Sequence, residues 1–151
     1  AAISKSAGTW MPSVASNIVK EARTAADAAF TLLVPIPIPS NASALKGAKL
    51  KSVDVFYKIG SAAADDFATV ELEKVGLAAA PSGEAVTITI DADHDTTAER
   101  KAMGDHMMTV TITTPAWLDD GDAYYLQLVV DAAATTVFTL FGARANYELR
   151  V

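Results

Sequence analysis

The stretch Met108-Thr109-Val110-Thr111-Ile112-Thr113 decides the fold class, because apolar and polar side chains alternate along it without a break. Alternation at every second residue is typical of a β-strand with one face buried and the other in water. Four further runs share this period, at residues 53–59, 70–73, 86–91 and 124–131. We therefore predict five strands between residues 50 and 131, each bounded by turns rich in Gly, Pro, Asp or Ala.

The apolar phase of the last segment slips by one residue near Gly142. Apolar side chains occupy the even positions 138 and 140, and then the odd positions from 143 to 151. A slip of one residue turns every side chain to the opposite face of a sheet. We predict a β-bulge, a bend or a strand junction at Gly142, with Tyr147 and Leu149 facing inward. A strand buried on both faces before Gly142 is the alternative.

The segment FTLLVPIPIP, residues 30–39, combines a strand period with three prolines. Its large apolar residues share the even positions, whereas Pro35, Pro37 and Pro39 share the odd ones. Successive N–H groups of an extended chain point to opposite lateral sides, so all three prolines remove donors from the same side. This pattern predicts an edge strand that is blocked against further pairing. A polyproline-like linker is the alternative.

The first 28 residues allow two interpretations. A helix over 13–27 would align the apolar residues at 14, 18, 22 and 25, whereas a strand over about 17–24 would turn through 25–27 into the strand that begins near Phe30. We favour the strand, because no long apolar helix face is available. Trp10 and Met11, followed by Pro12, predict an arm whose aromatic residue anchors on a neighbouring subunit.

These elements predict an all-β fold: a single antiparallel β-sandwich, jelly-roll-like, of about eight strands. Residues 1–28 would form an extended N-terminal arm or first strand, and residues 29–151 the sandwich domain. A chain of 151 residues buries roughly 70% of its unfolded surface and needs no disulfide or metal to fold. We find no signal peptide, and the longest uncharged run, 28–45, contains three prolines, so we expect no membrane partner.

Composition excludes several classes of function. The absence of cysteine rules out thiol catalysis, and the net charge of −6 argues against a specific nucleic-acid binder. The charge is uneven: residues 1–58 carry 7 basic and 3 acidic side chains, and residues 59–151 carry 5 and 15. Lys46, Lys49 and Lys51 contribute to the basic part, which predicts an orienting role in docking between subunits. Mutual neutralisation within one sandwich is the alternative.

The sequence Asp91-Ala92-Asp93-His94-Asp95 is a candidate cation loop, because alternating carboxylates can converge on a hard ion. It departs from the EF-hand pattern at Thr96 and Ala102, and a solvated loop is the preferred interpretation. His94 and His106, with Glu99 and Asp105 nearby, could instead ligate zinc, although exposed loop histidines are expected. We therefore expect no cofactor.

Paired acids next to aromatic residues at Asp119–Asp122 and Tyr124–Tyr125 are compatible with a sugar site, but Asp-Gly is also a strong turn signal. No Gly-x-Ser-x-Gly elbow, Walker loop or dinucleotide fingerprint occurs, and no enzymatic activity is expected.

Six segments together carry a resemblance to a known class: FTLLVPIPIP (30–39), VDVFYKI (53–59), DFATVELEKV (66–75), PAWL (115–118), YYLQLVVD (124–131) and LFGARANYEL (140–149). In the residue patterns of these segments and in their order along the chain, the sequence resembles uncharacterised structural proteins of tailed phages. The resemblance implies a jelly-roll-like virion component, such as a capsid decoration or fibre-base protein, often trimeric.

The expected function is thus that of a non-enzymatic, self-associating virion structural protein that coats or stabilises a capsid. Other virion proteins would be its partners, on the capsid surface and, during assembly, in the host cytoplasm. A carbohydrate-binding module and a subunit of an extracellular filament are the alternatives.

Overall fold

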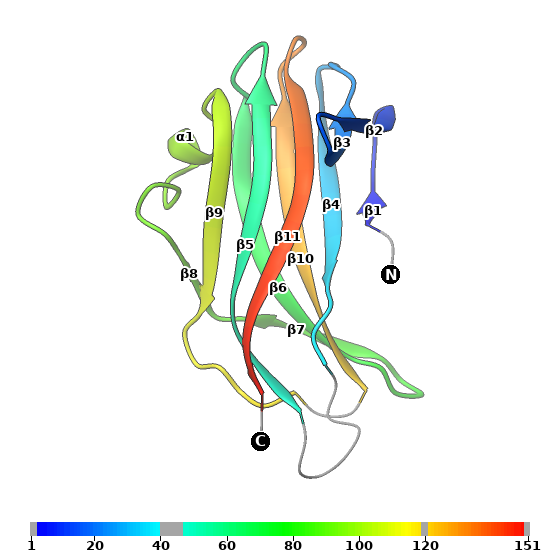
Figure 1. Cartoon of the computed structure of the whole chain (residues 1–151), viewed down its shortest axis with the longest axis vertical. Coiled ribbons are helices and arrows are strands. Elements are labelled where there is room, and N and C mark those ends of the chain that lie inside the picture. The colour runs from blue at the N-terminus through cyan, green and yellow to red at the C-terminus, as the bar shows by residue number, and fades with distance from the viewer. Residues whose placement is uncertain (1–2, 40–46, 119–120, 150–151) are drawn as a thin grey trace.

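The computed structural model describes residues 3–39, 47–118 and 121–149, and strands dominate it (Figure 1). Within this part of the chain there are eleven strands and one short helix. Their bounds are β1 Ser4–Lys5, β2 Trp10–Ala15, β3 Ile18–Arg23, β4 Ala28–Ile36, β5 Ala48–Gly60, β6 Asp66–Gly76, β7 Ser82–Val86, β8 Ile88–Ile90, α1 Thr97–Arg100, β9 Gly104–Ile112, β10 Asp122–Ala132 and β11 Val137–Leu149.

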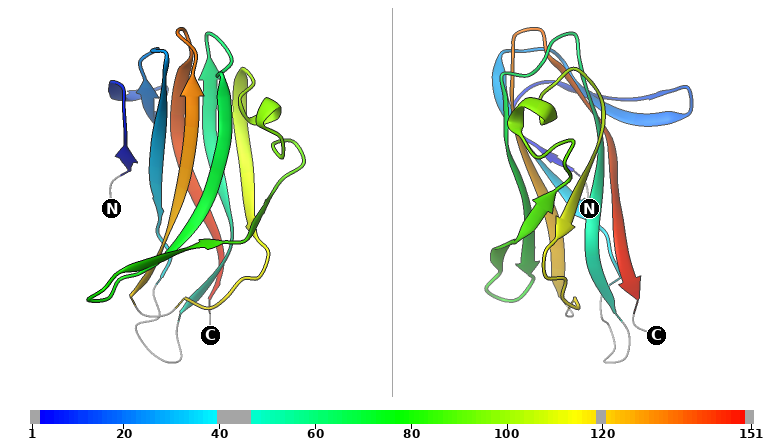
Figure 2. Two further views of the ribbon diagram at one scale, coloured as in Figure 1. Left: turned by 180° about the vertical axis from the view of Figure 1, so that it is seen from behind. Right: turned by 90° about the vertical axis from the view of Figure 1, so that its left-hand side faces the viewer.

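The strands form two antiparallel sheets that pack face to face (Figures 1 and 2). The β4 sheet has the order β1-β4-β10-β6-β7, and the β5 sheet has the order β2-β3-β11-β5-β9-β8. Each sheet buries one face against the other, which produces the alternating burial along the long strands. The prediction of an all-β antiparallel sandwich is confirmed.

The connectivity is that of a jelly roll. Strands β3 to β6 alternate between the two sheets, and the chain then returns so that β7 pairs with β6, β9 with β5, β10 with β4 and β11 with β3. A long hairpin folded over in this way is the eight-stranded, double-sheet architecture. The predicted count of about eight strands corresponds to this unit, to which β1, β2 and β8 are added.

The alternation at the sequence level identifies the core correctly in most strands. Fully or nearly fully buried apolar residues occupy the predicted inward positions of β5, β9 and β10: Val53, Val55, Tyr57, Ile59, Met108, Val110, Ile112, Tyr124, Leu126, Leu128 and Val130. The single strand predicted over 86–91 is wrong, because the chain crosses between sheets at Thr87 and forms β7 in one and β8 in the other. Both sheets face the same core, so the apolar alternation persists through the crossing.

The predicted bulge at Gly142 is confirmed. In the pairing of β11 with β5, Leu140 opposes Tyr57 and Gly142 opposes Phe56, so Phe141 is the extra residue. Gly142 has φ +145°, a conformation that glycine adopts without a steric penalty.

The inward orientation predicted for the end of β11 does not bury Tyr147 and Leu149. A second register shift lies between Asn146 and Tyr147, and the two residues are 42% and 55% exposed although they oppose the buried Leu50 and Ala48. The alternation of apolar residues indicates which face of the sheet a side chain occupies. Burial of that side chain also requires other residues to cover the face.

Of the three prolines predicted to block an edge strand, Pro35 lies within β4, on its outward side. The N–H and C=O of Thr31 bond to Ser6 next to β1, so the odd positions of β4 direct their backbone groups away from β10. Pro35 has this parity within the strand, and Pro37 and Pro39 follow its end at Ile36. At Leu32 and Leu33, β1 pairs with β4, so β4 is not the edge strand of its sheet there. The pairing with β1 ends at Leu33 and does not reach Pro35.

Residues 10–23 form a β-hairpin, so the strand interpretation is correct and the helix is wrong. Its partner was predicted wrongly: β3 pairs with β2 and β11, and the next segment, β4, lies in the other sheet. Ser16 and Asn17 have φ values of 53° and 64°, which is the pair of positive angles that a two-residue type I′ turn requires.

Candidate interaction surface

We call residues Trp10–Arg23, strands β2 and β3 with their turn, the arm hairpin. Figure 2 (right) shows it projecting beyond the two sheets, on the side of the β5 sheet. Its backbone pairs with the sandwich only at its base, where Glu21, Ala22 and Arg23 oppose Leu140, Thr139 and Phe138 of β11. The bulge at Phe141 and Gly142 follows directly, so β11 does not continue beside residues 18–20 of the arm hairpin.

The anchor of the arm hairpin belongs to its own chain. The Trp10 ring packs edge-on against Phe30 and Phe138 at centroid distances of 5.4 and 6.4 Å. Arg23 is 1% exposed beside it, with its guanidinium 4.7 Å from the Phe30 ring and bonds to the carbonyls of Ala26 and Ala28. Trp10 thus packs within its own chain, and its contact with a neighbouring subunit stays a prediction.

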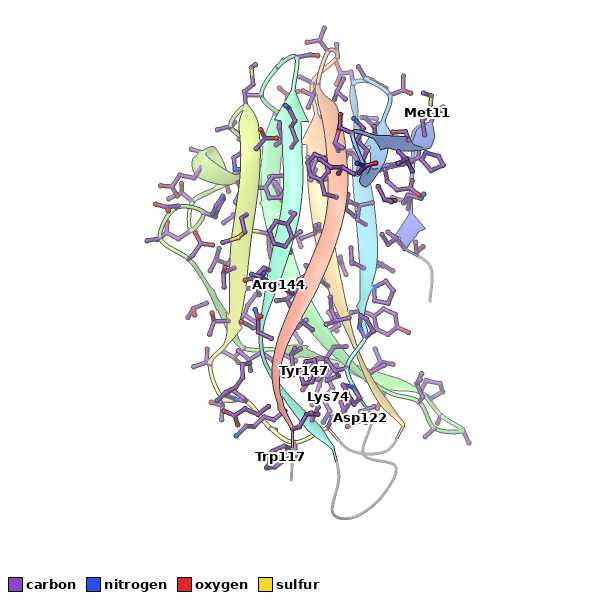
Figure 3. All side chains as sticks on the ribbon, viewed as in Figure 1. Met11, Lys74, Trp117, Asp122, Arg144 and Tyr147 are labelled. Atoms are coloured by element: carbon purple, nitrogen blue, oxygen red, sulfur yellow. The ribbon has the colours of Figure 1, made fainter. Side chains whose placement is uncertain are left out.

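Beyond its base, the arm hairpin exposes large apolar side chains. The exposed fractions are 60% for Met11, 69% for Val14, 50% for Ile18 and 69% for Val19. Val14 and Val19 oppose each other directly across the hairpin and therefore share one face. Figure 3 shows Met11 near the upper end of the molecule, far from Trp117 and Tyr147 at the lower end. Exposed apolar side chains grouped in this way make the arm hairpin a candidate interaction site.

The free edge of the arm hairpin is blocked by Pro12. Thr24 donates to the carbonyl of Thr9, so hydrogen-bonded pairs alternate along β2 and the pair of Pro12 with Glu21 is a non-bonded one. The nitrogen of Pro12 consequently faces away from β3, at the outer edge of the β5 sheet. Because proline has no N–H, another strand cannot complete a ladder there.

A shallow apolar groove lies beside the arm hairpin, on the outer face of the β5 sheet. Its cavity of about 420 Å³ is lined by Phe56 of β5, His106 and Met107 of β9, Phe141 of β11 and Ile18 of the arm hairpin. We call it the corner groove, because the sheet forms its floor and the arm hairpin one wall. Met107 is 51% exposed, and the guanidinium of Arg144 lies 5.5 Å from the ring of Phe56.

The floor of the corner groove is supported from below by a packed cluster. The Tyr57 ring stacks on His106 at 4.6 Å, and its hydroxyl donates to the carbonyl of Arg100 at 2.9 Å. Burial raises the pKa of this phenol, which therefore stays protonated and keeps donating. The Arg100 side chain donates in turn to the carbonyls of Phe67, His94 and Asp95, which fixes the loop before β9.

The lysines predicted to dock are paired within the chain where the structure describes them. Lys49 and Lys51 lie 2.9 and 3.0 Å from the carboxylate of Glu148, and these contacts lower the pKa of Glu148. Lys49 also lies 4.9 Å from the ring of Trp117. Lys46 falls outside the described residues.

The candidate cation loop is organised by hydrogen bonds. Asp91 Oδ1 lies 2.7 Å from His94 Nδ1 and accepts from the N–H of Asp93, while Oδ2 accepts from the N–H of Thr109 at 2.6 Å. Burial opposes ionisation of Asp91, but these bonds outweigh it and lower its pKa.

The two histidines meet in the same network. His94 Nε2 lies 3.2 Å from His106 Nδ1, and His106 Nε2 donates to the carbonyl of Ala102. His94 is buried, contrary to the exposed position expected for it, and Asp93 and Asp95 are exposed. No group of three or more His, Asp or Glu among residues 3–39, 47–118 and 121–149 could hold a metal ion.

Three of the sugar-site candidates meet at one cavity. Asp122, Tyr124 and Tyr125 line a cavity of about 270 Å³ together with Pro37, although Tyr124 is only 4% exposed and also packs into the core. Asp122 is bound by Lys74 at 3.2 Å. Asp119 and Asp120 fall outside the described residues.

No helix in the described part of the chain is long and apolar enough to cross a membrane. No protein-family model matches the sequence, and no curated protein matches it either.

Proposed function

We propose that this chain is a non-enzymatic structural protein that assembles with copies of itself through the arm hairpin. The observation that carries the proposal is the exposed valine pair, Val14 and Val19, on a projection whose backbone pairs with the sandwich only at its base. Burying the exposed half of each such side chain is worth about 1 kcal/mol, so an arm hairpin of four apolar residues gains several kcal/mol from a partner.

We further assign this assembly to a virion, as a capsid decoration or related component. Support comes from the jelly-roll connectivity, an architecture used by viral capsid domains and by lectins. The resemblance of the sequence to tailed-phage structural proteins points to the first of these uses. Other virion proteins as partners and the capsid surface as location belong to the same proposal.

Light scattering across a range of protein concentrations tests self-assembly. We expect a mass above the 15.8 kDa of one chain, and monomers for the Val14→Asp and Val19→Asp variants at unchanged melting temperature. Leu77→Asp is the matched control, because Leu77 is 59% exposed but lies outside the arm hairpin. A monomeric wild type at every concentration, or arm variants that keep the wild-type mass, would contradict the proposal.

The virion assignment is tested by the genes that flank the coding sequence. We expect capsid, portal or tail genes beside it. Neighbours devoted to metabolism or to cell-surface polysaccharide would overturn the assignment and leave the assembly proposal standing.

A further inference from the structure

Strands β4 and β10 separate at the lower end of the β4 sheet, and a cavity of about 270 Å³ opens where they part (Figure 1). Their ladder ends at the pair of Ile36 with Tyr124, whereas β10 continues beside β6 as far as Asp122. We call this opening the fork cavity. Its walls are largely apolar, because Pro37 and Ile38 line it from the segment that follows β4.

A second cavity, of about 290 Å³, lies over the ends of β6 and β7, and Asp122 lines it as well. We call it the polar cavity. Asp122 of β10 opposes Gly76 of β6, which opposes Ser82 of β7. A Cβ added at Gly76 would lie 3.7 Å from Oδ1 of Asp122 and 3.8 Å from Oγ of Ser82. The missing side chain therefore leaves a hollow between two polar groups.

The residues that line the polar cavity continue the face of the β4 sheet that forms the core. Tyr124, Lys74 and Glu84 oppose one another across β10, β6 and β7, next to the row that contains the fully buried Leu126 and Leu72. The side chain of Glu84 is 73% exposed. The inner face thus changes from apolar to charged at its lower end, where solvent reaches it.

The charged groups in the polar cavity are arranged around Lys74. Its Nζ lies 3.2 Å from Oδ2 of Asp122 and 3.9 Å from Oε1 of Glu84. The hydrogen bond to Asp122 raises the pKa of Lys74, and burial raises the pKa of Tyr124. Both groups therefore keep their protons at neutral pH and remain hydrogen-bond donors, while the two carboxylates remain acceptors.

This charge arrangement favours a neutral, polar ligand. One positive and two negative side chains surround the hollow, so an anion would be repelled by the net negative charge. A cation would meet the ammonium of Lys74, which already occupies the place between the carboxylates. Hydroxyl groups, which both donate and accept, match neighbouring donors and acceptors without adding charge.

We propose that the fork cavity and the polar cavity together bind a neutral carbohydrate. A sugar ring combines an apolar C–H face with a rim of hydroxyl groups. Its C–H face would lie against Tyr125 and Pro37 in the fork cavity, and its hydroxyls would reach Asp122 and Lys74. The joint volume falls within the roughly 300–1,000 Å³ of small-molecule sites.

This inference goes beyond the proposed self-assembly and does not depend on it. Figure 3 shows Lys74 and Asp122 near the lower end of the molecule, away from Met11 of the arm hairpin at the upper end. A carbohydrate bound at Asp122 would therefore leave the arm hairpin accessible.

An oligosaccharide array tests the class of ligand. The full chain is applied to immobilised neutral oligomers of glucose, mannose, galactose and N-acetylglucosamine, and to sialylated and sulfated oligosaccharides. We expect retention on neutral members, with the dissociation constant then measured by calorimetry on the free oligosaccharide. Retention on none of the members, or a preference for the sialylated or sulfated ones, would overturn the proposal.

Two substitutions locate the binding site. Asp122→Asn and Tyr125→Ala should each weaken binding by about tenfold or more, because one removes a charged acceptor and the other an aromatic wall. Glu71→Gln and Tyr147→Ala are the matched controls, since both side chains are exposed and neither lines the two cavities. Wild-type affinity in both Asp122→Asn and Tyr125→Ala would overturn the assignment.

A third variant blocks the site without removing an existing contact. Gly76→Gln places a side chain in the hollow, and its Cβ meets other atoms only at ordinary distances. We expect lost binding at an unchanged melting temperature. Undiminished binding by a folded Gly76→Gln protein would overturn the polar cavity as part of the site.

The outcomes separate this inference from the proposed function. A monomeric protein that binds neutral oligosaccharides would uphold the carbohydrate site and overturn self-assembly. A protein that assembles through the arm hairpin but binds none of them would do the reverse.

Discussion

Arg144 holds the buried carboxylate of Asp54, with Nε and Nη2 at 2.9 and 2.7 Å from Oδ2. Asn146 donates to the same oxygen and Thr109 to the other, so four donors from β9 and β11 converge on a side chain of β5 that is 4% exposed. This cluster ties β9, β5 and β11 together beneath the outer face of the β5 sheet.

The cluster at Asp54 predicts a loss of stability in acid. Burial raises the pKa of Asp54, but the bonds from Asn146, Arg144 and Thr109 outweigh it, and the folded pKa lies below its usual value. The folded state therefore binds this proton less readily than the unfolded chain, and the stabilisation present above pH about 4 is lost as the pH falls through the folded pKa.

Urea unfolding measures this contribution. At neutral pH, Asp54→Asn should lower the free energy of unfolding by about 1–3 kcal/mol, because a charged acceptor of several bonds is removed. Its stability should also change less than that of the wild type between pH about 5 and 2. Glu71→Gln, at an exposed position of β6, is the control. Parallel pH profiles for wild type and Asp54→Asn would refute the assignment.

Substitution at the bulge tests the backbone of β11. Gly142→Ala should destabilise the protein by about 1 kcal/mol or more, because φ +145° is strained for alanine even though no atom lies near the added carbon. Gly60→Ala is a matched control in the neighbouring strand, where the added carbon meets only a carbonyl oxygen at 3.9 Å. Equal melting temperatures for the two variants would show that the bulge is unstrained.

Removing the Trp10 ring should destabilise the fold. Trp10→Ala is expected to cost about 2–3 kcal/mol, less than a fully buried aromatic, because the ring packs on Phe30 and Phe138 but remains partly exposed. Met11→Ala, at the adjacent and 60% exposed position, should change the melting temperature little. If Trp10→Ala weakened assembly without lowering stability, the intersubunit role predicted from sequence would be supported.

Restoring a donor at the blocked edge should promote uncontrolled association. Pro12→Val supplies an N–H at the outer edge of β2, so we expect larger particles by light scattering and increased thioflavin binding. Pro81→Val changes a proline at an exposed position outside the strands and serves as the control. Identical particle sizes for the two variants would exclude a protective role for Pro12.

Local periodicity predicted the strands well and the sheets only in part. The alternation in β5, β9 and β10 located the core, and the phase slip located the bulge at Gly142. The passage of the chain from one sheet to the other at Thr87 was missed. The alternation of apolar residues distinguishes inward from outward positions, but it does not indicate to which sheet a residue belongs. The partner of β3 was missed because its pairing with β11 joins segments that are far apart in the sequence.

The interaction surface could be predicted less well. Trp10 attracted attention as a large aromatic among small residues, but its contacts with Phe30 and Phe138 exist only in the folded sandwich. Two signals were available in the sequence. Phe56 and Met107 are apolar at positions whose parity is outward, and Asn17 is a residue type that tolerates the positive φ of a tight hairpin turn.

The pairing of β3 with β11 also determines when, during synthesis of the chain, the base of the arm hairpin can be fixed. A ribosome makes the arm hairpin early, but the strand that holds its base is made after nearly all of the sandwich. A growing chain consequently cannot hold the base of the arm hairpin in place. The assembly that we propose through this projection would therefore be restricted to chains whose sandwich has closed.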